Sequence, residues 1–402
     1  MKSAFWQAGH RPTLIAAFLY FDLAFMVWVL LGPLAPEIAR DLDLNAAEKG
    51  LMVAVPTLAG ALLRIVNGLL VDRIGPKLAG TISQVIVIVG LFTAWLTGVN
   101  SFAGTIALGL ILGLAGASFA VALPLASRWY PPEHQGKAMG IAGMGNSGTV
   151  LASLFAPTVA KLFGWNAVLG LACIPLTIVL VAYQIMARDA PNAPPAKPLR
   201  AYLEPLRTAD AWWFMLFYGV TFGGFVGLSA SLSIYFTDTF QLSTIMAGYA
   251  TAACVFAGSL VRPLGGALAD RVGGIRTLSV VYVVAAAALV AVSTGPTSVA
   301  AALVFFVVAM LALGAGNGAV FQLVPQRFRD EIGIMTGLVG MAGGIGGFYL
   351  SSSLGFAKQV TGGYGSGFLI FSGLAIVALI GLNAVKRKWR TTWGAAVQGV
   401  RI

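Results

Sequence analysis

The chain is 402 residues long, with 58% hydrophobic residues, 10% charged residues and a formal net charge of +11 at pH 7. A soluble domain carries about 25% charged residues, so this composition excludes a soluble enzyme, a soluble nucleic-acid-binding protein and a disordered chain. The two cysteines, Cys173 and Cys254, lie inside apolar runs without metal-ligand spacing. We therefore expect no metal site and no other cofactor.

Apolar segments of at least about 20 residues, the length that spans a bilayer, recur along the whole chain. They lie near residues 12–35, 48–71, 77–97, 101–126, 135–160, 165–187, 210–238, 243–269, 275–294, 298–323, 332–357 and 364–386. Residues 188–209, between the sixth and seventh segments, are rich in proline and charge and are typical of a linker. The sequence thus predicts an all-α membrane protein of twelve transmembrane helices, in two six-helix halves at residues 1–187 and 210–402.

The Lys and Arg residues predict the orientation of these helices. With the N-terminus in the cytoplasm, 19 of the 25 lie in cytoplasmic segments, and only four lie outside: Arg40, Lys49, Lys161 and Lys358. This bias places both termini and the linker in the cytoplasm. It also explains most of the positive charge without a nucleic-acid partner, and the Lys386–Arg390 cluster suits an anionic lipid surface. Since no targeting segment is recognised, we expect a bacterial inner membrane location, and we expect a monomer.

An internal repeat relates the two halves. Residues 60–75, GALLRIVNGLLVDRIG, and residues 258–273, GSLVRPLGGALADRVG, are identical at eight of sixteen positions at an offset of 198. The repeat pairs Arg64 with Arg262, Asp72 with Asp270 and Arg73 with Arg271. Repeated halves around a site at the membrane midplane are typical of secondary transporters.

Only three charged residues lie deep inside the predicted spans, away from loops and span ends: Asp22, Arg64 and Arg262. A charge at the bilayer centre costs at least about 2.5 kcal/mol, so each is a candidate functional residue. Each arginine lies eight residues before the aspartate of its repeat, Asp72 or Asp270, which is about 12 Å into a core of roughly 30 Å. By the repeat symmetry both guanidiniums face one central cavity, and we expect them to bind an anion there.

Aromatic and polar residues lie at a similar depth and indicate the kind of anion. The expected neighbours of the arginines are Phe25, Phe119, Asn146, Tyr218, Phe222 and the glycines around Gly343. Guanidinium binds planar oxyanions at two points, and aromatic rings can stack on their flat faces. A small planar monoanion suits such a cavity better than phosphate or a sugar, although a carboxylate or phosphate transporter stays open at this point. A channel, a membrane-embedded sensor and a membrane enzyme are further alternatives.

Two sets of motifs carry a resemblance to known families. GLLVDRIGPK, from Gly68, and GALADRVGG, from Gly266, resemble the cytoplasmic loop signature of the major facilitator superfamily. This resemblance implies a gating latch that includes Asp72, Arg73, Asp270 and Arg271. The Gly-rich stretches GMGNSG at 143–148 and GMAGGIGG at 340–347, with YGVTF, GASFA and GAGNGAVFQ, resemble the nitrate/nitrite porter family of that superfamily.

The family resemblance implies specific roles for the candidate residues. It implies that Arg64 and Arg262 clamp nitrate or nitrite, that Phe25, Phe119 and Phe222 enclose the anion, and that Tyr218 and Asn146 contact it. It implies that glycines let helices shift during transport: Gly143, Gly145, Gly148, Gly340, Gly343 and Gly344. The second half departs from the first in having Gly343 where the first has Asn146.

Asp22 is the one carboxyl predicted inside the membrane, one helical turn before Phe25. Two arginines and one nitrate leave a net charge of +1. An ionised Asp22 could balance this charge, and protonation of Asp22 when the anion binds could couple nitrate uptake to pH. We therefore expect a nitrate importer driven by proton symport. A nitrate/nitrite antiporter, a transporter of another small anion and a purely structural Asp22 are the alternatives.

Overall fold

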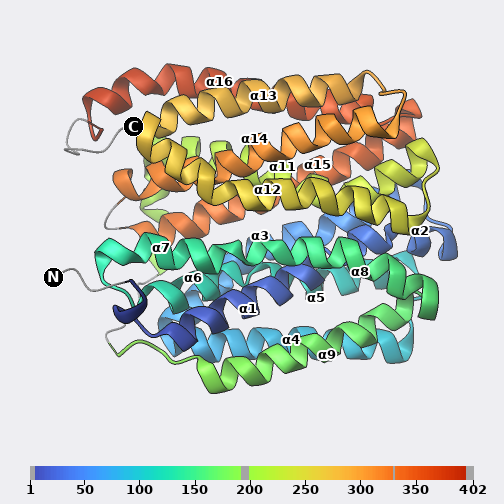
Figure 1. Cartoon of the computed structure of the whole chain (residues 1–402), viewed down its shortest axis with the longest axis horizontal. Helices are drawn as coiled ribbons and strands as arrows, with labels where there is room; N and C mark the ends of the chain where they lie inside the picture. The colour runs from blue at the N-terminus through green and yellow to red at the C-terminus, as the bar shows by residue number, and fades with distance from the viewer. Residues whose placement is uncertain (1–4, 192–198, 329–330, 395–402) are drawn as a thin grey trace.

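The computed structural model describes the whole chain except residues 1–4, 192–198, 329–330 and 395–402, and this part of the chain contains helices and no strand. The helices lie side by side along the long axis of the molecule (Figure 1). In the described residues, 11 helices are long and apolar enough to cross a membrane. The predicted all-α membrane fold is confirmed.

The helices before and after the predicted linker form two groups that lie on opposite sides of Figure 1. The N-terminal bundle contains α1 (Arg11–Trp28), α2 (Leu31–Asp41), α3 (Ala46–Ile74), α4 (Pro76–Thr97), α5 (Phe102–Gly116), α6 (Phe119–Ser127), α7 (Pro132–Gly143), α8 (Gly148–Phe163) and α9 (Trp165–Met186). The C-terminal bundle contains α11 (Ala209–Phe240), α12 (Thr244–Val272), α13 (Gly274–Ser293), α14 (Val299–Arg327), α15 (Ile332–Thr361) and α16 (Gly365–Thr391). The remaining helices are short: η1 (Phe5–Gln7), α10 (Leu199–Leu203) and η3 (Pro205–Arg207).

Three of the predicted spans in the N-terminal bundle are interrupted. The first divides into α1 and α2, where Pro33 lacks the N–H that would bond the carbonyl of Val29. The fourth divides into α5 and α6 at Ala117 and Ser118. The fifth divides into α7 and α8, joined by the 3-10 segment η2 (Met144–Ser147). Short irregular segments of this kind occur in membrane proteins where the backbone is buried in protein or lines a cavity.

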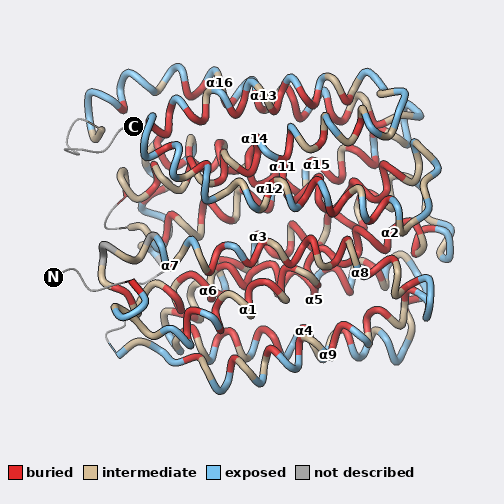
Figure 2. Tube along the Cα trace, viewed as in Figure 1, coloured by how far each residue is buried: buried red, intermediate tan, exposed pale blue. Residues whose placement is uncertain are grey.

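The two ends of the molecule differ in what they contain. The end that holds η1 and the last turn of α16 is here called the terminal end, and it lies at the left of Figure 1. The opposite end, here called the distal end, holds the connections from α2 to α3, from α11 to α12 and from α15 to α16. Buried residues follow the middle of both bundles, and exposed residues lie along the outer helices (Figure 2).

Glycine allows α1 to approach η2 and α8 closely. A Cβ atom at Gly148 would collide with the carbonyl oxygen of Asp22, and a Cβ atom at Gly145 would come within 2.8 Å of the Asp22 backbone nitrogen. A Cβ atom at Gly143 would meet nothing within 4 Å. The glycines of one short motif thus differ in role: two are needed for packing, whereas the third faces open space.

This difference generates a prediction on stability. Gly148→Ala should destabilise the protein by about 1–3 kcal/mol, because backbone atoms of α1 must shift to admit the methyl group. Gly143→Ala is the matched control in the same motif and should leave the stability unchanged. Thermal unfolding in detergent, followed by intrinsic tryptophan fluorescence, measures both. Equal melting temperatures for the two variants would contradict the close packing of α1 against α8.

Candidate functional site

Arg64 is a buried cation that both bundles hold in place. Its side chain lies in α3 and is 1% exposed. Its Nε donates a hydrogen bond to the carbonyl oxygen of Gly116 at 3.2 Å, and its Nη1 donates one to the carbonyl oxygen of Gly340. Gly116 ends α5 in the N-terminal bundle, whereas Gly340 belongs to α15 in the C-terminal bundle. The third nitrogen, Nη2, is buried and has no hydrogen-bond partner.

Arg262, the repeat equivalent of Arg64, is held by one phenol. Its Nη2 donates a hydrogen bond to the hydroxyl oxygen of Tyr218 at 3.3 Å. Its Nη1 is buried and lacks a partner, like Nη2 of Arg64. Each guanidinium therefore keeps a buried N–H donor unused. A buried donor without an acceptor costs about 1–3 kcal/mol, so a ligand that supplies an acceptor would bind favourably here.

A continuous set of aromatic rings connects the two arginines. The Arg64 guanidinium carbon lies 5.2 Å from the ring centre of Phe119, 5.3 Å from that of Phe222 and 5.5 Å from that of Trp28. Phe222 is stacked on Tyr218, with ring centres 5.0 Å apart and planes 5° from parallel. The predicted residues Phe119, Tyr218 and Phe222 thus lie together around Arg64 and Arg262.

Two further aromatic residues belong to this cluster and were not predicted. Phe321, in α14, lies 5.0 Å from Tyr218, 6.1 Å from Phe119 and 5.9 Å from the Arg262 guanidinium carbon. Trp28 lies beside Arg64 and donates from Nε1 to the carbonyl oxygen of Pro56 at 2.7 Å. Phe321 is part of the GAGNGAVFQ motif, and Trp28 follows Phe25 by three positions on one helix face, so both carried a usable signal.

Phe25 and Asn146 take different positions relative to this cluster. Phe25 is buried and contacts Phe21 and Trp28, with ring centres 4.3 and 4.7 Å apart, so Trp28 connects it to Arg64. Asn146 lies in η2, is 2% exposed, and has no hydrogen-bond partner for either its amide oxygen or its amide nitrogen. An unpartnered amide at this depth is a further donor for a ligand.

Two cavities connect the arginines to the terminal end. A cavity of about 600 Å³ is lined by Arg262, Phe321, Ser259 and Asp270 among others. A second cavity of about 440 Å³ is lined by Arg64, Asp72 and Arg128 among others. Both include Phe119, Leu123, Met139, Ile332 and Thr336 in their walls. Asp72 and Asp270, the aspartates of the two repeats, therefore lie at the mouths of cavities that reach the arginines.

The four charged residues of the predicted gating latch lie at the terminal end. Asp72 accepts a hydrogen bond from Arg128 at 3.0 Å, within the N-terminal bundle. Asp270 is exposed on the wall of the larger cavity, and Arg73 and Arg271 are exposed.

The three glycines predicted to let α15 shift lie at contacts with the site. Gly340 faces Arg64, and Gly343 packs against the rings of Tyr218 and Phe222. Gly344 packs against Ala61 of α3, where a Cβ atom would come within 2.7 Å of the alanine side chain. These contacts bring α15 close to both α3 and α11 at the level of the arginines.

Asp22 lies in α1 of the N-terminal bundle, one turn before Phe25, and is 7% exposed. Its Oδ1 accepts a hydrogen bond from the hydroxyl of Ser147 at 2.7 Å. Among the side chains that the structure describes, no Lys or Arg forms an ion pair with it. The carboxyl group is therefore held by a hydroxyl group between α1 and η2 and has no counter-cation in direct contact.

Comparison with known proteins gives consistent matches. A profile of the Major Facilitator Superfamily matches residues 16–351. The chain is 36% identical over 380 residues to a probable nitrate/nitrite transporter, NarK2, of Mycobacterium tuberculosis, covering 92% of this chain and 95% of the relative. It is 32% identical over 357 residues to a nitrite extrusion protein of Bacillus subtilis, covering 89% of each.

A solved structure gives the same fold. A bacterial homolog of the human lysosomal transporter Spinster matches with a TM-score of 0.70 at 19% identity, over 93% of this chain and 96% of that chain.

The position of Trp28 generates a second stability prediction. Trp28→Phe removes the hydrogen bond to Pro56 and leaves a void beside Arg64, so it should destabilise the protein by about 1–3 kcal/mol. Trp212→Phe is the matched control, because Trp212 is exposed and donates to the carbonyl oxygen of Leu206 at 2.8 Å. Thermal unfolding in detergent compares them. A Trp28→Phe protein as stable as the control would contradict this role of the indole.

Proposed function

This chain belongs to the nitrate/nitrite porter family of the major facilitator superfamily, and from that premise we propose that it imports nitrate by alternating access around Arg64 and Arg262. It is a multi-pass membrane transporter and not an enzyme. The observation that carries the proposal is that each arginine buries one N–H donor without a partner, with aromatic rings between the two.

The chemistry of the site favours a small planar monoanion. Nη2 of Arg64, Nη1 of Arg262 and the amide of Asn146 are three unused buried polar groups. Guanidinium N–H groups match the in-plane oxygens of a planar oxyanion such as nitrate or nitrite. The rings of Phe119, Phe222 and Phe321 present flat apolar surfaces, which suit the face of such an anion better than a fully hydrated phosphate. The names of the relatives support the same choice of substrate.

The proposed cycle uses the two bundles as halves that rock about the site, joined by residues 188–209. Both cavities reach the arginines from the terminal end, which we infer to be the cytoplasmic face because 19 of the 25 Lys and Arg residues are predicted there. The structure would then represent an inward-open state. Gly343 and Gly344 would let α15 shift against α11 and α3, as the tight contacts at these positions require small residues.

The proposed location and surroundings follow from the same orientation. We infer an inner membrane protein with both termini in the cytoplasm, active as a monomer. The basic last turn of α16, with Lys388 and Arg390, would then face the anionic headgroups of the cytoplasmic leaflet.

Asp22 is the proposed proton-coupling residue. It is a buried carboxyl without a cationic partner among the described residues, and Ser147 connects it to η2, the segment that holds Asn146. Protonation of Asp22 with anion binding would couple nitrate uptake to the proton gradient. Nitrate/nitrite exchange is the second candidate, which is favoured by the relative named as a nitrite extrusion protein.

The two-arginine site generates a prediction on transport. Arg64→Lys and Arg262→Lys should each lower kcat/KM for nitrate uptake about 10- to 100-fold, because lysine cannot form the paired hydrogen bonds of a guanidinium. Uptake of labelled nitrate into proteoliposomes measures this, with nitrite, formate and phosphate as competitors. Arg276→Lys, an exposed position in α13, is the control and should transport normally. Stronger competition by phosphate or formate than by nitrite would contradict the choice of substrate.

The role of Asp22 generates a prediction on pH dependence. Asp22→Asn should abolish uptake driven by a pH gradient while nitrate counterflow continues, because the amide cannot carry a proton. The measurement is uptake with a pH gradient on or off and with internal nitrite present or absent. Asp43→Asn, at an exposed position of the distal end, is the control. If pH-driven uptake survives in Asp22→Asn, the coupling role is wrong; if wild-type uptake needs internal nitrite, the protein is an exchanger.

A further inference from the structure

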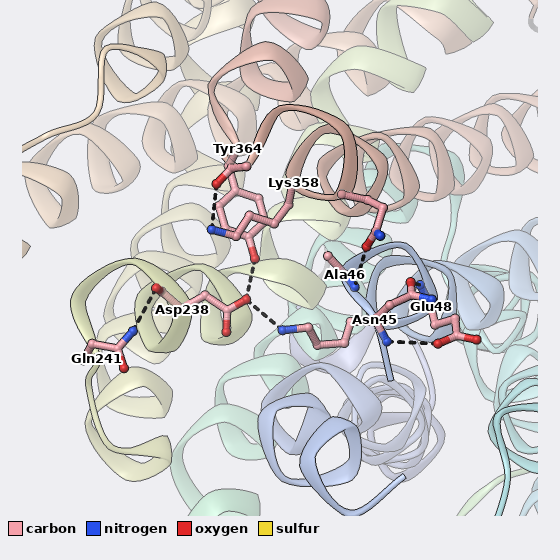
Figure 3. Close-up of polar contacts among 10 residues, drawn as sticks. Asn45, Ala46, Glu48, Asp238, Gln241, Lys358 and Tyr364 are labelled. Atoms are coloured by element: carbon pink, nitrogen blue, oxygen red, sulfur yellow. Dashed lines mark hydrogen bonds and ion pairs between the residues drawn. The ribbon is translucent and has the colours of Figure 1, made fainter. Parts of the chain in front are cut away.

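The distal end holds a charged contact between the two bundles. Lys49, at the start of α3, forms an ion pair with Asp238, near the end of α11, with Nζ and Oδ2 2.8 Å apart. The hydroxyl of Tyr364, just before α16, donates to the same Oδ2 at 2.8 Å. Figure 3 shows the side chain of Tyr364 pointing toward Asp238. One aspartate of the C-terminal bundle thus binds a cation of the N-terminal bundle.

Other contacts between the bundles lie at the same end. The backbone N–H of Ala46 donates to Oε1 of Gln359 at 3.1 Å, and the hydroxyl of Thr244 donates to Oε1 of Glu37 at 2.9 Å. Next to Lys49, a Cβ atom at Gly50 would come within 2.7 Å of the Cα atom of Gly355. The distal end is therefore closed by close backbone packing and by hydrogen bonds that cross from one bundle to the other.

The terminal end has a different pattern. The structure's described side chains form three ion pairs, and the two at the terminal end each stay within one bundle: Arg128 with Asp72, and Arg327 with Asp210. Of these three described pairs, the pair of Lys49 and Asp238 is the one that joins the bundles. Since cavities reach the arginines from the terminal end, the joined end is the closed one.

The surroundings of Tyr364 keep its hydroxyl directed at Asp238. Lys358 donates from Nζ to the carbonyl oxygen of Gly362 at 2.9 Å, and Nζ lies 5.4 Å from the ring centre of Tyr364 (Figure 3). Lys49 and Lys358 are two of the four basic residues that depart from the predicted cytoplasmic bias. Both make contacts in the distal cluster, which consists of Lys49, Asp238, Lys358 and Tyr364. These contacts explain why positive charge is found at this end.

We propose that Lys49, Asp238 and Tyr364 form a latch that stabilises the state closed at the distal end and must break when the cavity opens there. The side chains of Lys49 and Asp238 are 17% and 20% exposed, so water and salt screen their attraction only in part. Opening the distal end separates α3 from α11, so that Lys49 and Asp238 no longer pair with each other. The proposal depends on alternating access and not on the identity of the anion.

Cysteine accessibility tests this latch. Ala54 is fully buried and follows Gly50 by one turn on the face of α3 that packs on α15, so a cysteine there reports opening of the distal end. Ala54→Cys is introduced with Cys173 and Cys254 replaced by serine, and its rate of maleimide labelling is measured in detergent. Lys49→Gln and Asp238→Asn should each raise this rate about five-fold or more. Tyr364→Phe, a milder change, should raise it less.

Matched variants separate a latch from general destabilisation. The exchange Lys49→Asp with Asp238→Lys should return labelling toward the wild-type rate, because it restores the ion pair. Lys161→Gln removes an exposed distal charge outside this cluster and should have no effect. A cysteine at Thr336, in the wall shared by both terminal-end cavities, should not label faster in the latch variants.

Two outcomes would overturn the proposal: unchanged labelling at Ala54→Cys in both Lys49→Gln and Asp238→Asn, or no recovery when the two charges are exchanged. The assay contains no nitrate, so its outcome is independent of the uptake experiments.

Discussion

The placement of two guanidinium groups inside an apolar helix bundle, with Arg64 fully buried and Arg262 partly buried, is the constraint on which the site depends. A charge in this environment must find acceptors or aromatic faces, because water does not supply them. Arg64 finds carbonyl groups at Gly116 and Gly340 and three aromatic rings. A larger residue at Gly340 would crowd the arginine, since a Cβ atom there would lie 3.2 Å from Nη1. The need to satisfy the cation thus explains why glycine and aromatic residues gather at this depth.

The same constraint ties the site to the arrangement of the bundles. Arg64 belongs to α3, yet one of its acceptors is on α15 in the other bundle. An anion that takes up the unused donors would add acceptors between the halves, and rocking of α15 would change the geometry of the Gly340 contact. In the proposed cycle, occupancy of the site and the relative position of the bundles would therefore be coupled through the Arg64 side chain.

Sequence alone predicted the fold and most of the arginine cluster, because membrane spans, an internal repeat and charges within apolar segments are local signals. Phe119, Tyr218 and Phe222 were found from their depth along single helices. Phe321 and Trp28 were missed, because ring stacking depends on how helices rotate against one another. The 3-10 segment at Met144–Ser147 and the contact of Lys49 with Asp238 also depend on tertiary packing, since residues at helix ends look solvent-exposed in a sequence.

The repeat also shows where two similar halves stop being equivalent. At the offset of 198, Asp270 corresponds to Asp72, and each half has an arginine at the end of its fourth span: Arg128 follows α6, and Arg327 ends α14. Arg128 pairs with Asp72, whereas Arg327 pairs with Asp210, and Asp270 remains exposed at a cavity mouth. The two mouths therefore differ in how their aspartate is paired, although their motifs match. The repeated sequence specifies a shared scaffold, whereas residues outside the repeat determine which partner each charged residue binds.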